Sequence, residues 1–261
     1  MSRALLAANW KLNPTSAGAA LDLVRGVEAA ARERQDQVQV AVFPPFPWLL
    51  GVSELLADGP IELGAQDCYW EASGAFTGEV SAAMLKDWCP WVIVGHSERR
   101  RLFLETDEMV ARKTGAALAC QLTTIVCVGE SESELAAGEA EAVVSRQVRA
   151  ALAEVAADDS PRLLFAYEPL WAIGTGRNAE PEHAYRMMRL VRNHASELLG
   201  AGAAARLRVL YGGSVSRATV GSYVELPWCD GCLVGSASLN AGEFSAMIEI
   251  VAEVYGAGRG T

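Results

Sequence analysis

The chain has 261 residues, of which 51% are hydrophobic and 21% are charged. This composition is typical of a folded globular protein and excludes a disordered one. Its 22 Lys and Arg residues are outnumbered by 32 Asp and Glu residues, which gives a formal net charge of -10. Because the chain is acidic and has no long basic block, we expect neither a nucleic-acid surface nor binding to an anionic membrane.

The sequence predicts neither a membrane span nor a secretory signal. The longest stretch without a charge, residues 37–53, contains three prolines, whereas a spanning helix needs roughly 20 mostly apolar residues. The first eleven residues hold too short an apolar run for a signal peptide. Six widely spaced cysteines suit reduced thiols better than a disulfide framework. We therefore expect a soluble cytoplasmic protein.

Short apolar runs recur along the chain and are separated by longer amphipathic stretches. Most runs are apolar at nearly every position, which is typical of parallel strands that are covered on both faces. Three intervening stretches have helical spacing of their apolar residues, namely residues 17–34, 132–155 and 181–199. The predicted strands are, in chain order, residues 4–8, 38–43, 61–65, 91–94, 124–128, 163–167, 208–211 and 232–234.

Eight strand–helix alternations fit a closed (β/α)8 barrel better than a doubly wound sheet with a second domain. Barrels of this kind often use about 250 residues for one domain. No linker or low-complexity segment rich in Pro, Gly or Ser interrupts the series. We therefore expect residues 1–261 to form a single α/β barrel domain.

Polar residues gather directly after five of the predicted strands. In a parallel barrel these positions all lie at the carboxyl ends of the strands, where the following loops build the active site. A single coincidence would be weak evidence, but five on one rim predict a functional site. The residues are Asn9 and Lys11, then His96, Ser97 and Glu98, then Glu168, then Ser214, and finally Gly235 and Ser236.

Three of these side chains suit acid–base chemistry, although each also has an ordinary structural interpretation. Lys11 could be a solvated lysine, but at the barrel mouth its charge would attract an anionic substrate. His96 could be structural, but it precedes Ser97, a good helix N-cap, and the positive end of that helix would keep the imidazole neutral. Glu168 could pair with a base, but beside a closable apolar loop it is also suited to abstract a proton.

Glycine-containing turns follow the last two strands, at residues 211–216 and 233–238. Either one alone could be an ordinary tight turn. As a pair after strands seven and eight they favour a phosphate site, because glycine lets backbone N–H groups approach a ligand closely. The segment at residues 169–176 could be a buried connection, but its apolar residues between glycines predict a mobile lid, with Gly174 N–H reaching the phosphate.

Two cysteines, Cys229 and Cys232, have the spacing of a redox or zinc half-site. No second pair of ligands accompanies them, and Cys232 begins a predicted strand. We therefore predict that both are structural, and we expect no metal site.

The same segments closely resemble the triosephosphate isomerase family, in order and over essentially the whole chain. The His-Ser-Glu-Arg-Arg motif at residues 96–100 and the longer motif at residues 166–176 are highly specific for it. The other matching segments are residues 8–13, 74–81, 127–130, 211–215 and 233–239.

The resemblance implies interconversion of dihydroxyacetone phosphate and glyceraldehyde 3-phosphate without a cofactor or metal. Glu168 would move a carbon-bound proton, and neutral His96 would polarise the carbonyl group and shuttle protons between oxygens. Asn9 and Lys11 would stabilise negative charge, with Glu98 supporting the site.

The resemblance also implies a phosphate site and a homodimer. Phosphate would lie against backbone N–H groups of Gly174, Ser214, Gly235 and Ser236. The loop at residues 74–81, with Phe76 and Thr77, resembles the segment that family members insert into a partner subunit.

One departure from the family pattern is Ser236, which stands where a second consecutive glycine is usual. If that position needs a positive φ, the serine would strain the turn. If it does not, the hydroxyl group could add a contact to the phosphate.

Three other functions compete with the triose reaction. An isomerase of a four-carbon tetrulose phosphate would use the same base and acid. A Schiff-base barrel aldolase would use Lys11 as its nucleophile. A non-catalytic phosphate-binding barrel would leave Glu168, His96 and Lys11 without a shared purpose.

Overall fold

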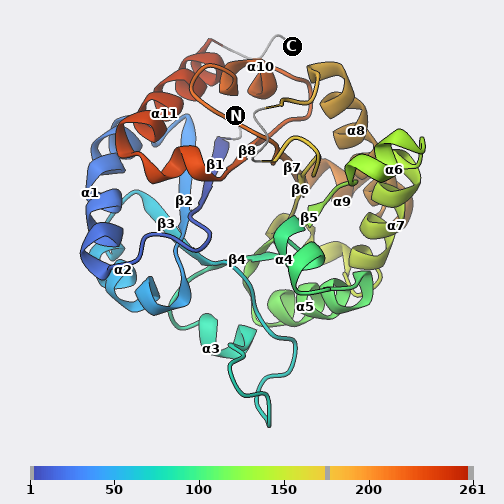
Figure 1. The fold of residues 1–261 in the computed structure, drawn as a ribbon, viewed down its shortest axis with the longest axis horizontal. Coiled ribbons are helices and arrows are strands. Elements are labelled where there is room, and N and C mark those ends of the chain that lie inside the picture. The colour runs from blue at the N-terminus through green and yellow to red at the C-terminus, as the bar shows by residue number, and fades with distance from the viewer. Residues whose placement is uncertain (1–2, 174–176, 258–261) are drawn as a thin grey trace.

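A computed structural model describes residues 3–173 and 177–257 of the chain. Within these residues, eight parallel strands close into a barrel in which each strand pairs with the next and β8 returns to β1 (Figure 1). The predicted (β/α)8 barrel is therefore confirmed. The strands are β1 (Ala4–Asn9), β2 (Val38–Phe43), β3 (Ile61–Ala65), β4 (Trp91–Val94), β5 (Thr123–Val128), β6 (Leu163–Tyr167), β7 (Arg208–Tyr211) and β8 (Gly231–Val234).

Helices cover the outside of the barrel, as Figure 1 shows. The described α-helices are α1 (Ala17–Glu33), α2 (Leu49–Leu56), α3 (Ala82–Leu85), α4 (Ser97–Leu102), α5 (Asp107–Ala119), α6 (Glu132–Ala136), α7 (Ala140–Leu152), α8 (Pro181–Leu199), α9 (Ala201–Arg206), α10 (Val220–Val224) and α11 (Ala241–Gly256). Short 3₁₀ turns lie at η1 (Phe46–Trp48), η2 (Ala157–Arg162) and η3 (Ser236–Leu239). In the described ranges, none of the helices combines the length and apolar composition needed to cross a bilayer.

The strands are buried on both faces because they separate two layers of apolar packing. One cluster consists of strand residues alone, among them Leu5, Phe43 and Ile125, and it fills the interior of the barrel. The other cluster joins the outward-facing strand residues to the helices. Cys127 belongs to the inner cluster and is buried, as expected of a small core residue. The near-continuous apolar runs follow from this two-sided burial.

The stretch at residues 132–155 has the apolar spacing of a helix, but it is not continuously helical. The segment forms two helices, α6 and α7, which are separated by a turn. Gly138 in that turn has a φ of +74°, a left-handed conformation that glycine adopts without steric cost. Its N–H donates to the carbonyl oxygen of Leu135 and ends the first helix.

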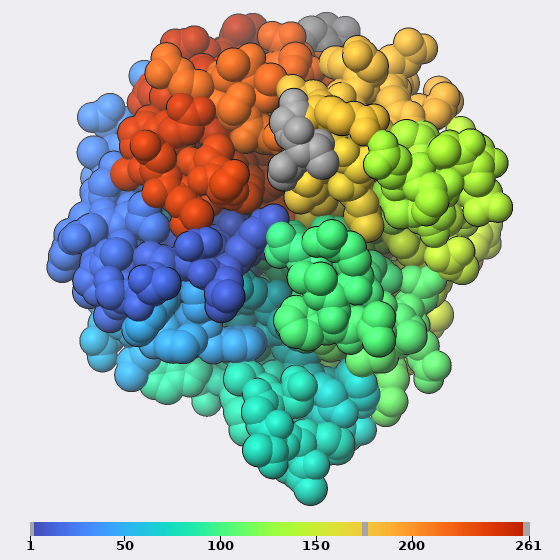
Figure 2. Space-filling model, in the orientation of Figure 1, coloured from blue at the N-terminus to red at the C-terminus, as the bar shows by residue number. Residues whose placement is uncertain are grey.

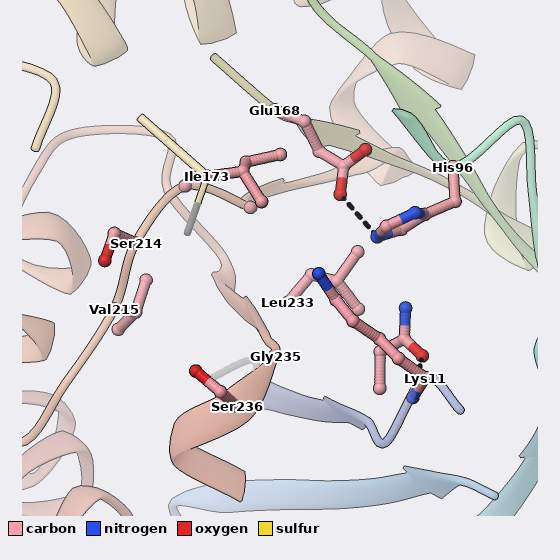
Figure 3. Close-up of a pocket in the computed structure, with 12 residues that line it drawn as sticks. Lys11, His96, Glu168, Ile173, Ser214, Val215, Leu233, Gly235 and Ser236 are labelled. Atoms are coloured by element: carbon pink, nitrogen blue, oxygen red, sulfur yellow. Dashed lines mark hydrogen bonds and ion pairs between the residues drawn. The ribbon is translucent and has the colours of Figure 1, made fainter. Parts of the chain in front are cut away.

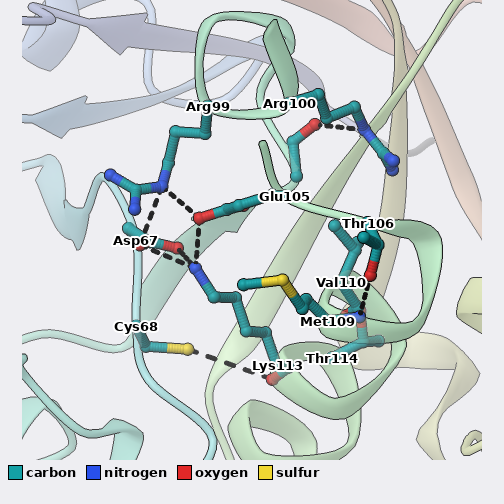
Figure 4. A network of polar contacts seen from close by, with 11 residues as sticks. Asp67, Cys68, Arg99, Arg100, Glu105, Thr106, Met109, Val110, Lys113 and Thr114 are labelled. Atoms are coloured by element: carbon teal, nitrogen blue, oxygen red, sulfur yellow. Dashed lines mark hydrogen bonds and ion pairs between the residues drawn. The ribbon is translucent and has the colours of Figure 1, made fainter. Parts of the chain in front are cut away.

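A buried network of charged groups fixes α4 and α5 to the end of β3 (Figure 4). Lys113 of α5 donates to both carboxylate oxygens of Asp67, at 2.7 and 2.8 Å, and also to Glu105. Arg99 of α4 bridges the same two carboxylates. Burial raises the pKa of Asp67 to about 6, although Lys113 opposes the shift. The network holds α4 in place, and α4 begins beside the cavity described below.

The loop between β3 and α3 projects from the barrel wall, as the space-filling view shows (Figure 2). Phe76 and Thr77 near its tip are exposed, with 41% of the Phe76 surface accessible. An exposed aromatic residue on a projecting loop is typical of a contact surface.

Candidate active site

A cavity of about 190 Å³ lies at the carboxyl ends of the strands. This volume is below the range usual for drug-sized ligands and suits a small substrate. Loops after β1, β4, β6, β7 and β8 contribute to it, and Figure 3 shows the Lys11, His96 and Glu168 side chains beside the same space. The lining residues are Asn9, Lys11, His96, Glu168, Ile173, Gly212, Gly213, Ser214, Val215, Leu233, Gly235 and Ser236.

The His96 ring is oriented by the start of α4. His96, and not Ser97 as the sequence predicts, is the N-cap residue, and its Nδ1 accepts a hydrogen bond from the backbone N–H of Glu98. Because Nδ1 is an acceptor, the neutral ring carries its proton on Nε2. The Nε2 atom points toward Glu168 and lies 3.1 Å from its Oε1 (Figure 3).

The Glu168 side chain is almost fully buried, with 2% of its surface exposed. It follows β6 directly, and its Oε2 accepts a hydrogen bond of 2.9 Å from the backbone N–H of Ser97. Burial pushes the pKa of Glu168 up, but His96, the Ser97 N–H and Lys11 together hold that pKa below its usual value. The group is therefore an ionised carboxylate at neutral pH, as a general base must be.

Asn9 is the last residue of β1, and Lys11 follows the strand in an unusual backbone conformation. Lys11 has a φ of +54°, which costs roughly 1 to 2 kcal/mol for a residue other than glycine. The turn is held because Asn9 Oδ1 accepts from the Lys11 backbone N–H at 3.0 Å. The Lys11 ammonium group lies 2.7 Å from Glu98 Oε1. Strain of this kind is often found at functional sites.

The opposite end of the cavity is built from glycine and serine. A Cβ atom on Gly213 would lie only 2.1 Å from the Tyr211 hydroxyl oxygen, so glycine is required beside Ser214. Ser236 opens η3 and is absent from the described residues with positive φ. Ser236 therefore does not strain the turn through a positive φ. Gly174 lies outside the described residues.

The cavity is also lined by two apolar residues, Leu233 and Val215, which lie inside the matching segments but to which the sequence assigned no role. Each belongs to, or follows, a strand that the sequence did predict, but apolar residues near a strand end carry no distinctive signal. A second cavity of about 280 Å³ adjoins the first and is lined by Lys11, Ser97, Glu98, Arg101, Leu170 and Ile173. The two cavities share Lys11 and Ile173.

The Cys229 and Cys232 side chains are buried at the other end of β8. The Cys229 thiol donates to the carbonyl oxygen of Gly231 at 3.2 Å. Within the described part of the chain, no group of three or more His, Cys, Asp or Glu side chains is arranged to hold a metal ion.

A carboxylate, an imidazole and an ammonium group thus meet beside glycine-rich turns at one end of a parallel barrel. This combination is typical of barrel enzymes that use acid–base chemistry on a small anionic substrate. Comparison with known proteins identifies the particular family. The family model described as Triosephosphate isomerase matches residues 4–251.

Similar proteins cover nearly the whole chain. A triosephosphate isomerase from Chloroflexus aurantiacus is 49% identical over 94% of this chain and 97% of its own. One from Roseiflexus sp. is 46% identical over 96% of this chain and 98% of its own. One from Acidithiobacillus ferrooxidans is 44% identical over the full length of both chains. This chain belongs to the triosephosphate isomerase family.

Proposed function

We propose that this chain interconverts dihydroxyacetone phosphate and D-glyceraldehyde 3-phosphate, with Glu168 as the base and His96 as the electrophile and proton shuttle. The observation that carries the proposal is the contact between Glu168 and the Nε2 atom of His96 in one small cavity. Family membership supports the triose substrate over the four-carbon tetrulose phosphate.

The reaction begins when the Glu168 carboxylate removes a proton from the carbon next to the substrate carbonyl. The electron pair of that C–H bond forms the carbon–carbon double bond, and the carbonyl oxygen takes up the negative charge as an enediolate. Neutral His96 donates its Nε2 proton toward that oxygen and passes a proton between the two oxygens. Glu168 then returns the carbon-bound proton to the neighbouring carbon, which completes the isomerisation.

Lys11 and Asn9 stabilise the charge that develops during this step. Asn9 is buried, and Lys11 is held by Glu98 at the edge of the cavity. Fixed charges and dipoles act strongly in a site from which water is excluded, because they need no reorganisation when the charge forms.

The phosphate group occupies the glycine and serine end of the cavity. Backbone N–H groups at Ser214, Gly235 and Ser236 bind it, and the Ser236 hydroxyl adds a donor. Gly174 is assigned the same role from its sequence position alone. Ile173 lines the cavity and helps to exclude water from it, and the dry site protects the enediolate from losing phosphate.

We further propose that residues 1–261 form one catalytic domain of a homodimer in the cytoplasm. The exposed Phe76 and Thr77 side chains on the projecting loop support the dimer. No cofactor or metal ion takes part in this mechanism.

A coupled assay with D-glyceraldehyde 3-phosphate tests the proposed reaction directly. Rapid formation of dihydroxyacetone phosphate is expected, with a higher kcat/KM than for a four-carbon ketose phosphate. A preference for the four-carbon substrate would replace the triose assignment. Borohydride trapping of Lys11 in the presence of substrate would indicate an aldolase instead.

A further inference from the structure

Close to the cavity lies a fully buried carboxylate that the proposed reaction does not use. Glu130, in the loop after β5, is 0% exposed. It accepts hydrogen bonds from the Tyr167 hydroxyl, at 3.0 and 3.1 Å to its two oxygens, and from Trp171 Nε1 at 2.8 Å. Its own carbonyl oxygen accepts from the backbone N–H of Leu170 at 3.0 Å. Glu130 therefore anchors the first part of the loop that follows Glu168.

His183, in the first turn of α8, joins this cluster from the far side of the loop. Its Nε2 lies 2.9 Å from the Tyr167 oxygen and 3.4 Å from Glu130 Oε1. Its ring also meets Trp171 edge-on, with ring centres 5.9 Å apart. The other ring nitrogen, Nδ1, lies 3.1 Å from the guanidinium group of Arg186.

The donors and acceptors of the cluster fix the direction of the hydrogen bonds that run from Arg186 through His183 and Tyr167 to Glu130. An Arg186 N–H can only donate, so Nδ1 of His183 accepts and the ring proton sits on Nε2. That proton then goes to the Tyr167 oxygen, and the single Tyr167 proton goes to Glu130. Burial raises the pKa of Tyr167, and Glu130 raises it further, so the hydroxyl keeps its proton.

We propose that His183, held as its neutral Nε2–H tautomer by Arg186, is a positioning residue for the loop that follows the base. It holds Tyr167 and Trp171 against Glu130 and so fixes residues 169–173. This inference rests on the proposed function, because the effect of His183 is measured as a change in the rate and the phosphate release of the triose reaction.

The cluster connects to the cavity at two points. Tyr167 immediately precedes Glu168, and Trp171 lies two residues before Ile173, which lines the cavity. A loosened Trp171 displaces Ile173 and opens the cavity to water, so that the enediolate can lose its phosphate group. In that side reaction the enediolate oxygen re-forms a carbonyl group and the electrons of the carbon–carbon double bond form a new double bond to the phosphate-bearing carbon. The bond from that carbon to the phosphate oxygen breaks, which releases inorganic phosphate and leaves the enol of 2-oxopropanal.

The charged groups around the cluster stabilise the same arrangement. Arg186 also lies 3.4 Å from Glu141 of α7, which steadies its guanidinium group. Arg177, on the carboxyl side of the loop, lies over the Trp171 ring and pairs with Glu132 of α6 at 2.6 Å.

The test uses two substitutions of His183 and a matched control. His183→Leu keeps an apolar contact with Trp171 but removes the donor. His183→Gln retains one donor and one acceptor. His194→Leu makes the same change on the same helix, where the ring contacts Ser145 and Glu197 and not the cluster. For each variant, kcat/KM and the inorganic phosphate released per triose isomerised are measured.

His183→Leu is expected to lower kcat/KM about tenfold and to raise phosphate release by about the same factor, the effect of one lost hydrogen bond. His183→Gln is expected to remain within about twofold of the wild type, and His194→Leu to leave phosphate release unchanged. Wild-type phosphate release in His183→Leu would overturn the proposal, as would equal effects of the two leucine variants.

Nitrogen-15 NMR of the wild-type protein tests the tautomer without any variant that could fail to fold. A His183 ring protonated on Nε2 alone is expected, and a proton on Nδ1 would contradict the inference. If the wild type does not isomerise triose phosphate at all, the proposed function fails, which is a different outcome from a wild-type enzyme that is insensitive to His183.

Discussion

Two replacements of Lys11 separate the contribution of its charge to catalysis from the cost of its backbone conformation to stability. Lys11→Met removes the ammonium group, while Lys11→Gly also relieves the φ of +54°. A charge about 4 Å from the enediolate at an effective dielectric constant of roughly 20 contributes about 4 kcal/mol. Both variants should therefore lose roughly a thousandfold in kcat/KM.

Lys11→Gly should have the higher free energy of unfolding of the two variants, although glycine usually destabilises a folded protein. Glycine adopts the left-handed conformation without the steric cost, which raises the free energy of unfolding by roughly 1 to 2 kcal/mol. The extra freedom of glycine in the unfolded chain lowers it by about 0.5 to 1 kcal/mol. The ion pair with Glu98 is lost in both variants and cancels. Lys11→Gly should thus be about 1 kcal/mol more stable than Lys11→Met.

Steady-state assays and urea unfolding measure the two effects separately. Gln121→Gly is the matched control, because Gln121 has a φ of +64° in the turn before β5, at the opposite end of the barrel from the cavity. It should gain about 1 kcal/mol without any change in kcat/KM. Activity of Lys11→Met within tenfold of the wild type would contradict the role of its charge, and a lower stability of Lys11→Gly than of Lys11→Met would contradict the cost of its backbone conformation.

Three further substitutions test other parts of the account. Because the pKa of Asp67 is raised to about 6, its ionisation costs stability as the pH rises. The wild type should therefore lose about 2 kcal/mol relative to Asp67→Asn between pH 4 and pH 7 in denaturant unfolding, and a constant difference would contradict this. Thr77→Arg should give a monomer of much reduced activity, and a fully active dimer in ultracentrifugation would count against the dimer proposal. Ser236→Gly should raise KM by up to about tenfold with kcat unchanged, and an unaltered KM would remove the hydroxyl from the phosphate site.

The strands could be predicted because burial on both faces requires a nearly continuous run of apolar residues in the sequence. In β2, β3, β4, β6 and β7 the predicted bounds agree with the structure, because the inner and outer layers both require apolar residues. The convergence of polar residues could be inferred for a related reason, because parallel strands end on one rim. The break at Gly138 was missed, because an amphipathic pattern continues across a single left-handed turn.

Side-chain contacts between distant elements could not be predicted. The helix cap at His96 depends on backbone angles that place Nδ1 next to the Glu98 N–H, whereas the sequence favoured Ser97 as the cap. Lys113 looks like an ordinary charged residue in the sequence, yet it is buried against Asp67. His183 carries no motif, and its role emerges only where α8 meets the loops after β5 and β6.

Isotope exchange in heavy water shows whether Glu168 transfers the carbon-bound proton. Wild-type protein incubated with dihydroxyacetone phosphate in D₂O should incorporate deuterium at the carbon next to the carbonyl group, as followed by proton NMR. Glu168→Gln should slow that incorporation by orders of magnitude while substrate binding changes little, because the loss falls on the transition state. Incorporation at the wild-type rate in Glu168→Gln would contradict the account.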